Sequence, residues 1–283
     1  MLVHGLGQNR YAWHRRALDG EPPRRRAAGT SSTSTCAGHG RSGVGDEALV
    51  DRPLRRRPRA RDGRGARAHR GGSGAVGHSL GGLLLALAAR EPERVAAVAS
   101  FAAPYEFGAG NRALRALRWA LDHAGPVSER ARARRLPFEL VWSLFRRGRR
   151  VWDAPRIPLP LRAWRPGAFE PAALDEYLSL AFDRGYVGEL LDLSRCDAFD
   201  RAHGGAAMRE RFESLSLPIL VVAGEHDLLA PPASVLPAYT RSRSPARRYA
   251  ALPFGHGDLL LGRDAPRLTW PTLDAWLASL PAP

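Results

Sequence analysis

Residues 75–90 read AVGHSLGGLLLALAAR, and the order of residue types in this stretch decides the fold class. Two apolar residues, Ala75 and Val76, lead into a glycine-rich turn, and an uninterrupted run of helix formers follows over residues 83–90. The stretch therefore predicts a strand, a tight turn and a helix in direct succession, which is the repeating unit of a sheet flanked by helices.

Further strand and helix patterns lie on the C-terminal side of this unit. Residues 95–101 are an apolar strand candidate, and residues 217–224 form the strongest buried strand pattern in the chain. A helix is predicted over residues 269–280. These patterns predict an α/β core, a mostly parallel sheet flanked by helices, formed by residues 1–107 and 215–283.

Residues 108–214 show helical rather than strand periodicity. A helix is predicted over residues 172–182, and two further helices are indicated by apolar residues at helical spacing: Leu114, Leu117, Ala120 and Leu121, then Leu140, Val141, Leu144 and Phe145. We expect a mostly helical insertion that covers the core as a cap. Its tryptophans, Trp119, Trp142, Trp152 and Trp164, are interpreted as packing residues.

Residues 15–74 do not fit the pattern of the rest. Arginine triplets at 24–26 and 55–57 occupy places where a strand and a helix should be, and the glycine-rich residues 71–74 precede Ala75. Glycine weakens a strand, so the strand leading into the turn is expected to be largely missing. Two explanations remain open: a disordered basic loop, or a segment translated out of frame from GC-rich DNA, which we favour.

The charge of the chain raises a nucleic-acid hypothesis. The 283 residues carry a formal charge of +15, and every basic residue other than histidine is arginine. An arginine-only excess alongside abundant alanine, glycine and proline indicates a compositional bias more than a phosphate-binding face, so no nucleic-acid partner is predicted.

Several other classes are disfavoured by composition. The two cysteines, Cys36 and Cys196, are too few and too far apart to suggest a disulfide framework or a metal site. No apolar run approaches the ~20 residues of a membrane span. No secretory signal is visible at the start, so a cytoplasmic location is the default prediction.

The chemistry-bearing motif is Gly77-x-Ser79-x-Gly81. In a strand-turn-helix setting this motif is a nucleophile elbow, which exposes the serine hydroxyl at the edge of a sheet. A serine needs a general base and an acid to orient that base. Asp227 follows the predicted strand 217–224, with Glu225 as the alternative acid, and His256 lies between two glycines before the last helix.

These segments resemble the α/β-hydrolase superfamily. The resemblance rests on His4-Gly5, the run Gly38-His39-Gly40-Arg41-Ser42, the elbow at Ser79, and the segments of Asp227 and His256, all in the family's order. It implies a triad of Ser79, Asp227 and His256, with the backbone N–H groups of Leu6 and Leu80 as oxyanion donors. Members usually have one or two strands before the His-Gly loop, so we expect an N-terminal truncation.

The resemblance implies a serine hydrolase, an esterase or lipase acting on a small-molecule or lipid-like carboxylic ester without a cofactor. Two alternatives remain open: a non-catalytic remnant of the same fold, and a basic nucleic-acid-binding protein. Asp258, two residues after His256, is interpreted as an orienter or a turn residue, and His78 as a structural or substrate-facing part of the elbow.

Overall fold

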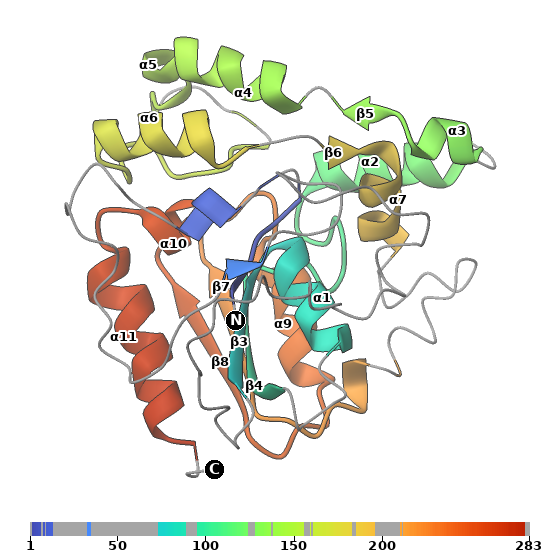
Figure 1. Cartoon of the computed structure of the whole chain (residues 1–283), viewed down its shortest axis with the longest axis vertical. Coiled ribbons are helices and arrows are strands. Elements are labelled where there is room, and N and C mark those ends of the chain that lie inside the picture. Colours follow the sequence, from blue (N-terminus) through green and yellow to red (C-terminus); the bar gives the residue numbers. More distant parts are fainter. Residues whose placement is uncertain are drawn as a thin grey trace, which may run out of the picture.

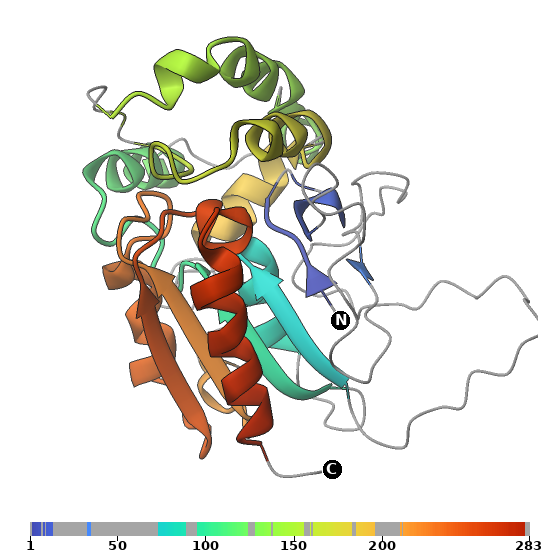
Figure 2. The same cartoon turned by 90° about the vertical axis from the view of Figure 1, so that its left-hand side faces the viewer.

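A six-stranded parallel sheet forms the centre of the protein (Figures 1 and 2). The computed structural model describes residues 2–6, 8, 10–13, 33–34, 73–88, 95–123, 128–136, 138–155, 159, 161–182, 185–195, 210 and 212–280. The strands run in the order β2-β1-β3-β4-β7-β8. Their bounds are Leu2–Val3 (β1), Thr33–Ser34 (β2), Ser73–His78 (β3), Val95–Phe101 (β4), Ile219–Gly224 (β7) and Arg247–Leu252 (β8).

The predicted α/β fold is confirmed, because every strand pair in this sheet is parallel and helices lie on both faces. In Figures 1 and 2, α11 covers one face, and α1 and α9 cover the other. Strand β7 is buried along its whole length, as its continuous apolar sequence requires. The helices of this layer are Leu80–Ala88 (α1), Pro232–Thr240 (α9), Asp258–Leu261 (α10) and Ala265–Ala278 (α11).

Strand β3 corrects one expectation. The strand that leads into the turn at Ser79 is six residues long and includes Gly74, although its glycine content predicted a largely missing strand. Its hydrogen-bonded neighbours, β1 and β4, lie on both sides. Gly74 is exposed, and a β-carbon there would have Leu277 of α11 as its nearest neighbour at 3.8 Å, so this part of the strand is held by its pairing with β4. Otherwise the unusual segment 15–74, including residues 38–42, lies almost entirely outside the described residues.

A second layer of helices lies over one end of the sheet, at the top of Figure 1. A short antiparallel pair, β5 (Arg135–Leu136) and β6 (Gly185–Tyr186), joins this layer. Its helices are Arg112–His123 (α2), Glu129–Arg132 (α3), Phe138–Arg147 (α4), Arg149–Trp152 (α5), Pro171–Leu180 (α6) and Val187–Arg195 (α7). A 3-10 helix, η1 (Arg10–Trp13), lies between β1 and β2 in sequence.

Aromatic side chains hold α4, α5 and α6 together. Trp142 stacks on Phe182 with ring centroids 3.9 Å apart, and Phe145 stacks on Trp152 at 4.5 Å. Trp164 is buried beside Phe145. Three of the four tryptophans therefore pack as predicted, whereas Trp119 is exposed and stacks on the exposed His123.

Candidate active site

Ser79 occupies the turn between β3 and α1 in a backbone conformation that serine rarely adopts. Its φ is +54°, in the left-handed region. The Ser79 N–H donates to the carbonyl of Phe101 (2.8 Å), and the Ser79 carbonyl accepts from the N–H of Gly82 (3.0 Å). These bonds hold the strained turn between the neighbouring strand β4 and the first turn of α1.

The glycine at position 81 is required by close backbone contact. A β-carbon there would lie 2.5 Å from the carbonyl oxygens of both Val3 and His4. The start of α1 therefore lies directly against β1, which brings the loop after β1 beside Ser79. A β-carbon on Gly5 in that loop would lie 3.0 Å from the Ser79 β-carbon.

Asp227 and His256 form a buried pair at the ends of β7 and β8. The Nδ1 atom of His256 lies 2.7 Å from Asp227 Oδ2. The other carboxylate oxygen, Oδ1, accepts hydrogen bonds from the N–H groups of Leu229 and Ala230, both at 2.8 Å. Because a carboxylate only accepts, Nδ1 carries the hydrogen and leaves Nε2 of the imidazole as an acceptor. The alternative acid, Glu225, is exposed and is not joined to His256.

His78 packs against His256 from the elbow. Its Nε2 donates to the carbonyl oxygen of His256 (3.0 Å), and the two rings lie 4.5 Å apart between centroids. Burial, and then the neighbouring His256, lower the pKa of His78 well below its ordinary value. His78 is therefore a neutral donor that holds the loop carrying His256.

The structure brings Asp227 and His256 together, and Ser79 directly follows His78, which contacts His256. Among the described residues, no hydrogen bond joins Ser79 Oγ to His256. Catalytic contacts between a nucleophile and its base are often loose before a substrate binds.

Leu6 and Leu80 are the residues predicted to supply oxyanion donors. Leu80 is the first residue of α1, so its N–H has no acceptor within the helix. Leu6 lies in the loop that packs against Ser79. Within the described part of the chain, neither N–H group has a hydrogen-bond acceptor.

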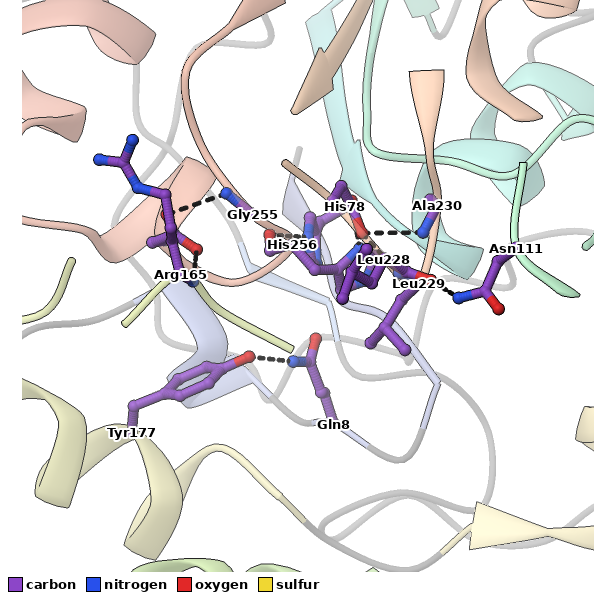
Figure 3. Close-up of polar contacts among 12 residues, drawn as sticks. Gln8, His78, Asn111, Arg165, Tyr177, Leu228, Leu229, Ala230, Gly255 and His256 are labelled. Atoms are coloured by element: carbon purple, nitrogen blue, oxygen red, sulfur yellow. Dashed lines mark hydrogen bonds and ion pairs between the residues drawn. The ribbon is translucent and has the colours of Figure 1, made fainter. Parts of the chain in front are cut away.

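Gln8 links this loop to the helical layer and was not predicted from the sequence. Its Oε1 accepts from the N–H of Gly5 (3.0 Å), and its Nε2 donates to the Tyr177 hydroxyl on α6 (2.6 Å; Figure 3). Burial raises the pKa of Tyr177 far above its ordinary value, so the hydroxyl stays protonated. No local pattern reveals this pair, because its members lie 169 residues apart.

Asp258 links the His256 loop to the same layer. Its buried carboxylate accepts from the N–H groups of Gly255 (2.9 Å) and Arg165 (3.0 Å). The N–H of Gly257 also donates to the carbonyl of Ala163 (2.7 Å). Asp258 is thus a turn residue that also anchors the segment around Arg165, and burial raises its pKa.

Metal-binding groups and membrane-spanning helices are both absent from the described ranges. There, no group of three or more His, Cys, Asp or Glu side chains is arranged to hold a metal ion. No helix in that part of the chain is long and apolar enough to cross a bilayer.

Four of the six strands of the central sheet fall within one family match. A family model described as alpha/beta hydrolase fold matches residues 73–262. This chain belongs to the α/β-hydrolase fold family. The match runs from the start of β3 to just beyond α10 and includes Ser79, Asp227 and His256. Membership supports hydrolase activity and does not specify the bond that is cleaved.

Solved structures share this α/β-hydrolase fold over nearly the whole chain. A monoacylglycerol lipase of Paleococcus ferrophilus is 17% identical, with 98% of this chain and 93% of that chain covered and a TM-score of 0.54. An enol-lactonase of Burkholderia xenovorans LB400 is 19% identical, with 98% and 90% covered and a TM-score of 0.50. A thermophilic esterase of Thermogutta terrifontis is 19% identical, with 98% and 88% covered and a TM-score of 0.50. At these identities the likeness concerns the fold. No curated protein matches the sequence.

Proposed function

We propose that this α/β-hydrolase is a serine hydrolase that cleaves the carboxylic ester of a small, lipid-like molecule through an acyl-enzyme on Ser79. The observation that carries the proposal is the 2.7 Å contact between His256 Nδ1 and a buried Asp227, at the sheet edge where the strained turn presents Ser79. A buried imidazole held by a carboxylate beside a serine is the arrangement that acyl transfer requires.

In the proposed reaction, His256 acts as base and then as acid. Its Nε2 takes the proton of Ser79 Oγ as that oxygen attacks the ester carbonyl carbon, and Asp227 stabilises the imidazolium that forms. The imidazolium then protonates the leaving alcohol oxygen, and the acyl group stays on Ser79. A water molecule, deprotonated by His256, attacks the acyl carbon, which releases the carboxylic acid and restores the Ser79 hydroxyl.

The negative charge on the carbonyl oxygen would be held by the N–H groups of Leu6 and Leu80. One such donor contributes about 3 to 4 kcal/mol to transition-state stabilisation. Gln8 supports this arrangement, because its bond to the Gly5 N–H fixes the loop that carries Leu6. The proposed reaction uses no cofactor.

The proposal is tested by covalent labelling with a fluorophosphonate probe and by hydrolysis of p-nitrophenyl esters of increasing acyl length. We expect the wild-type protein to be labelled and Ser79→Ala to lose both labelling and about 1,000-fold or more in kcat. Ser234→Ala is the matched control, because Ser234 Oγ is buried on α9 without a hydrogen-bond partner among the described residues. The control should label like the wild type.

A non-catalytic protein of the same fold is the second candidate. The missing hydrogen bond between Ser79 Oγ and His256 in the described structure favours it. Absence of labelling in wild-type protein that shows cooperative unfolding would support this candidate, and labelling that persists in Ser79→Ala would show that Ser79 is not the nucleophile.

A further inference from the structure

Helix α4 is apolar on two opposite faces. Its inner face carries Trp142 and Phe145, which stack on Phe182 and Trp152 and join α4 to α5 and α6. The outer face is also apolar, although nothing in the described chain covers it. Its side chains recur at one side of the helix and continue into α5, with exposed fractions of 57% for Leu140, 51% for Leu144 and 56% for Val151.

The position of this outer face sets it apart from the α/β core. In Figures 1 and 2, α4 and α5 form the outermost layer, and α6 lies between them and the sheet. Leu140 and Leu144 lie on successive turns of α4 and Val151 lies on α5, each more than half exposed, with Val141 exposed beside them on α4. A continuous apolar strip of this kind on a helix surface indicates an interaction site rather than scattered surface residues.

The strip is bordered by positive charge. Residues 138–152 contain four arginines and one glutamate. Arg149 is neutralised by Asp175, whereas the exposed Arg147 and Arg150 have no acidic partner among the described residues. An apolar strip with a cationic border is complementary to a lipid surface that has apolar acyl chains below anionic headgroups.

We propose that the outer face of α4 and α5 binds an anionic lipid surface. Leu140, Leu144 and Val151 would insert at the boundary of the headgroups and acyl chains, and Arg147 and Arg150 would contact headgroup phosphates. A second copy of this chain fits less well, because pairing the two faces would bring their unpaired arginines together. The proposal goes beyond the esterase function and does not depend on it.

The experiment is co-flotation of the full chain with vesicles of phosphatidylcholine containing phosphatidylglycerol, compared with vesicles of phosphatidylcholine alone. We expect the wild type to float with the anionic vesicles. The double variant L140S/L144S should reduce the bound fraction about tenfold, and R147Q/R150Q should remove the preference for anionic vesicles.

Two control double variants test whether vesicle binding depends on this face or only on the positive charge of the whole chain. L236S/L268S changes two leucines, each 39% exposed, on α9 and α11 of the core. R248Q/R267Q removes two positive charges, as R147Q/R150Q does, from exposed positions on the surface of the α/β core. Both controls should bind anionic vesicles like the wild type, and circular dichroism should show that all four variants remain folded.

Several results would overturn the proposal. The proposal would be excluded if the wild-type protein did not float with anionic vesicles. It would also be excluded if R248Q/R267Q lost as much vesicle binding as R147Q/R150Q. Light scattering that shows a wild-type dimer dissociated by L140S/L144S would assign the face to a second copy instead.

Discussion

His78 makes two contacts with His256 through one imidazole. It donates to the His256 carbonyl and lies against the His256 ring, while its own Nδ1 has no partner among the described residues. A protonated His78 would place an unpaired positive charge in the buried site, beside the imidazole of His256, which is proposed to accept a proton. The lowered pKa of His78 prevents this near neutral pH.

This burial should be visible as a pH dependence of stability. The unfolded chain takes up a proton on His78 near its ordinary pKa of 6.5, whereas the folded protein resists it, so stability falls as the pH falls below this value. The slope reaches at most about 1.4 kcal/mol per pH unit. We expect wild-type stability, measured by urea unfolding, to fall more than that of His78→Gln between about pH 7.5 and pH 5. A constant difference between the two proteins across this range would contradict the assignment.

At the scale of elements, the contact of α1 with β1 depends on Gly81. Gly81→Ala would force a β-carbon to 2.5 Å from two carbonyl oxygens of β1 and its loop. We expect it to lose more than about 3 kcal/mol of unfolding free energy and most of the soluble yield. Gly74→Ala is the control, because its β-carbon would have its nearest neighbour, Leu277, at 3.8 Å. A Gly81→Ala protein as stable as Gly74→Ala would show that the two elements are not in close contact.

The anchoring of the Arg165 segment by Asp258 gives a second prediction at this scale. Asp258→Ala leaves the buried N–H group of Gly255 and the part-buried N–H group of Arg165 without their acceptor. We expect the free energy of unfolding, measured by chemical denaturation, to fall by about 2 to 5 kcal/mol, since each unpaired group costs about 1 to 3 kcal/mol. Asp264→Ala should change stability by less than about 0.5 kcal/mol, because Asp264 is half exposed and its ion pair with Arg267 spans 3.8 Å. Equal losses in both variants would refute the anchoring role.

At the scale of the whole molecule, stability rests on the centre of the sheet. Leu220 is fully buried in β7, which lies between β4 and β8. Leu220→Ala should lower the free energy of unfolding by about 2 to 5 kcal/mol in urea titration. Leu236→Ala, on the exposed side of α9, should cost less than about 1 kcal/mol. A small loss at Leu220 would mean that β7 is not central to the core.

The sequence allowed the fold to be predicted wherever the pattern was local. The turn and helix around Ser79 and the buried strand β7 follow from runs of adjacent residues, and their prediction is confirmed. The strand before Ser79 was predicted wrongly, because it forms through its pairing with β1 and β4, which the local pattern does not reveal. The contact of Arg165 with Asp258 spans 93 residues and was likewise outside any pattern. The catalytic roles of Ser79, Asp227 and His256 stay predictions.

One stretch of the helical layer touches both halves of the site. Ala163 and Arg165 bind the loop of His256, and Tyr177, on the helix that follows, binds Gln8 beside the loop of Leu6. An outward movement of this stretch would break all three contacts at once. If substrate entered through such a movement, substrate binding and hydrolysis would alternate in time. Each opening would break the alignment between the loop that carries His256 and the loop that carries Leu6.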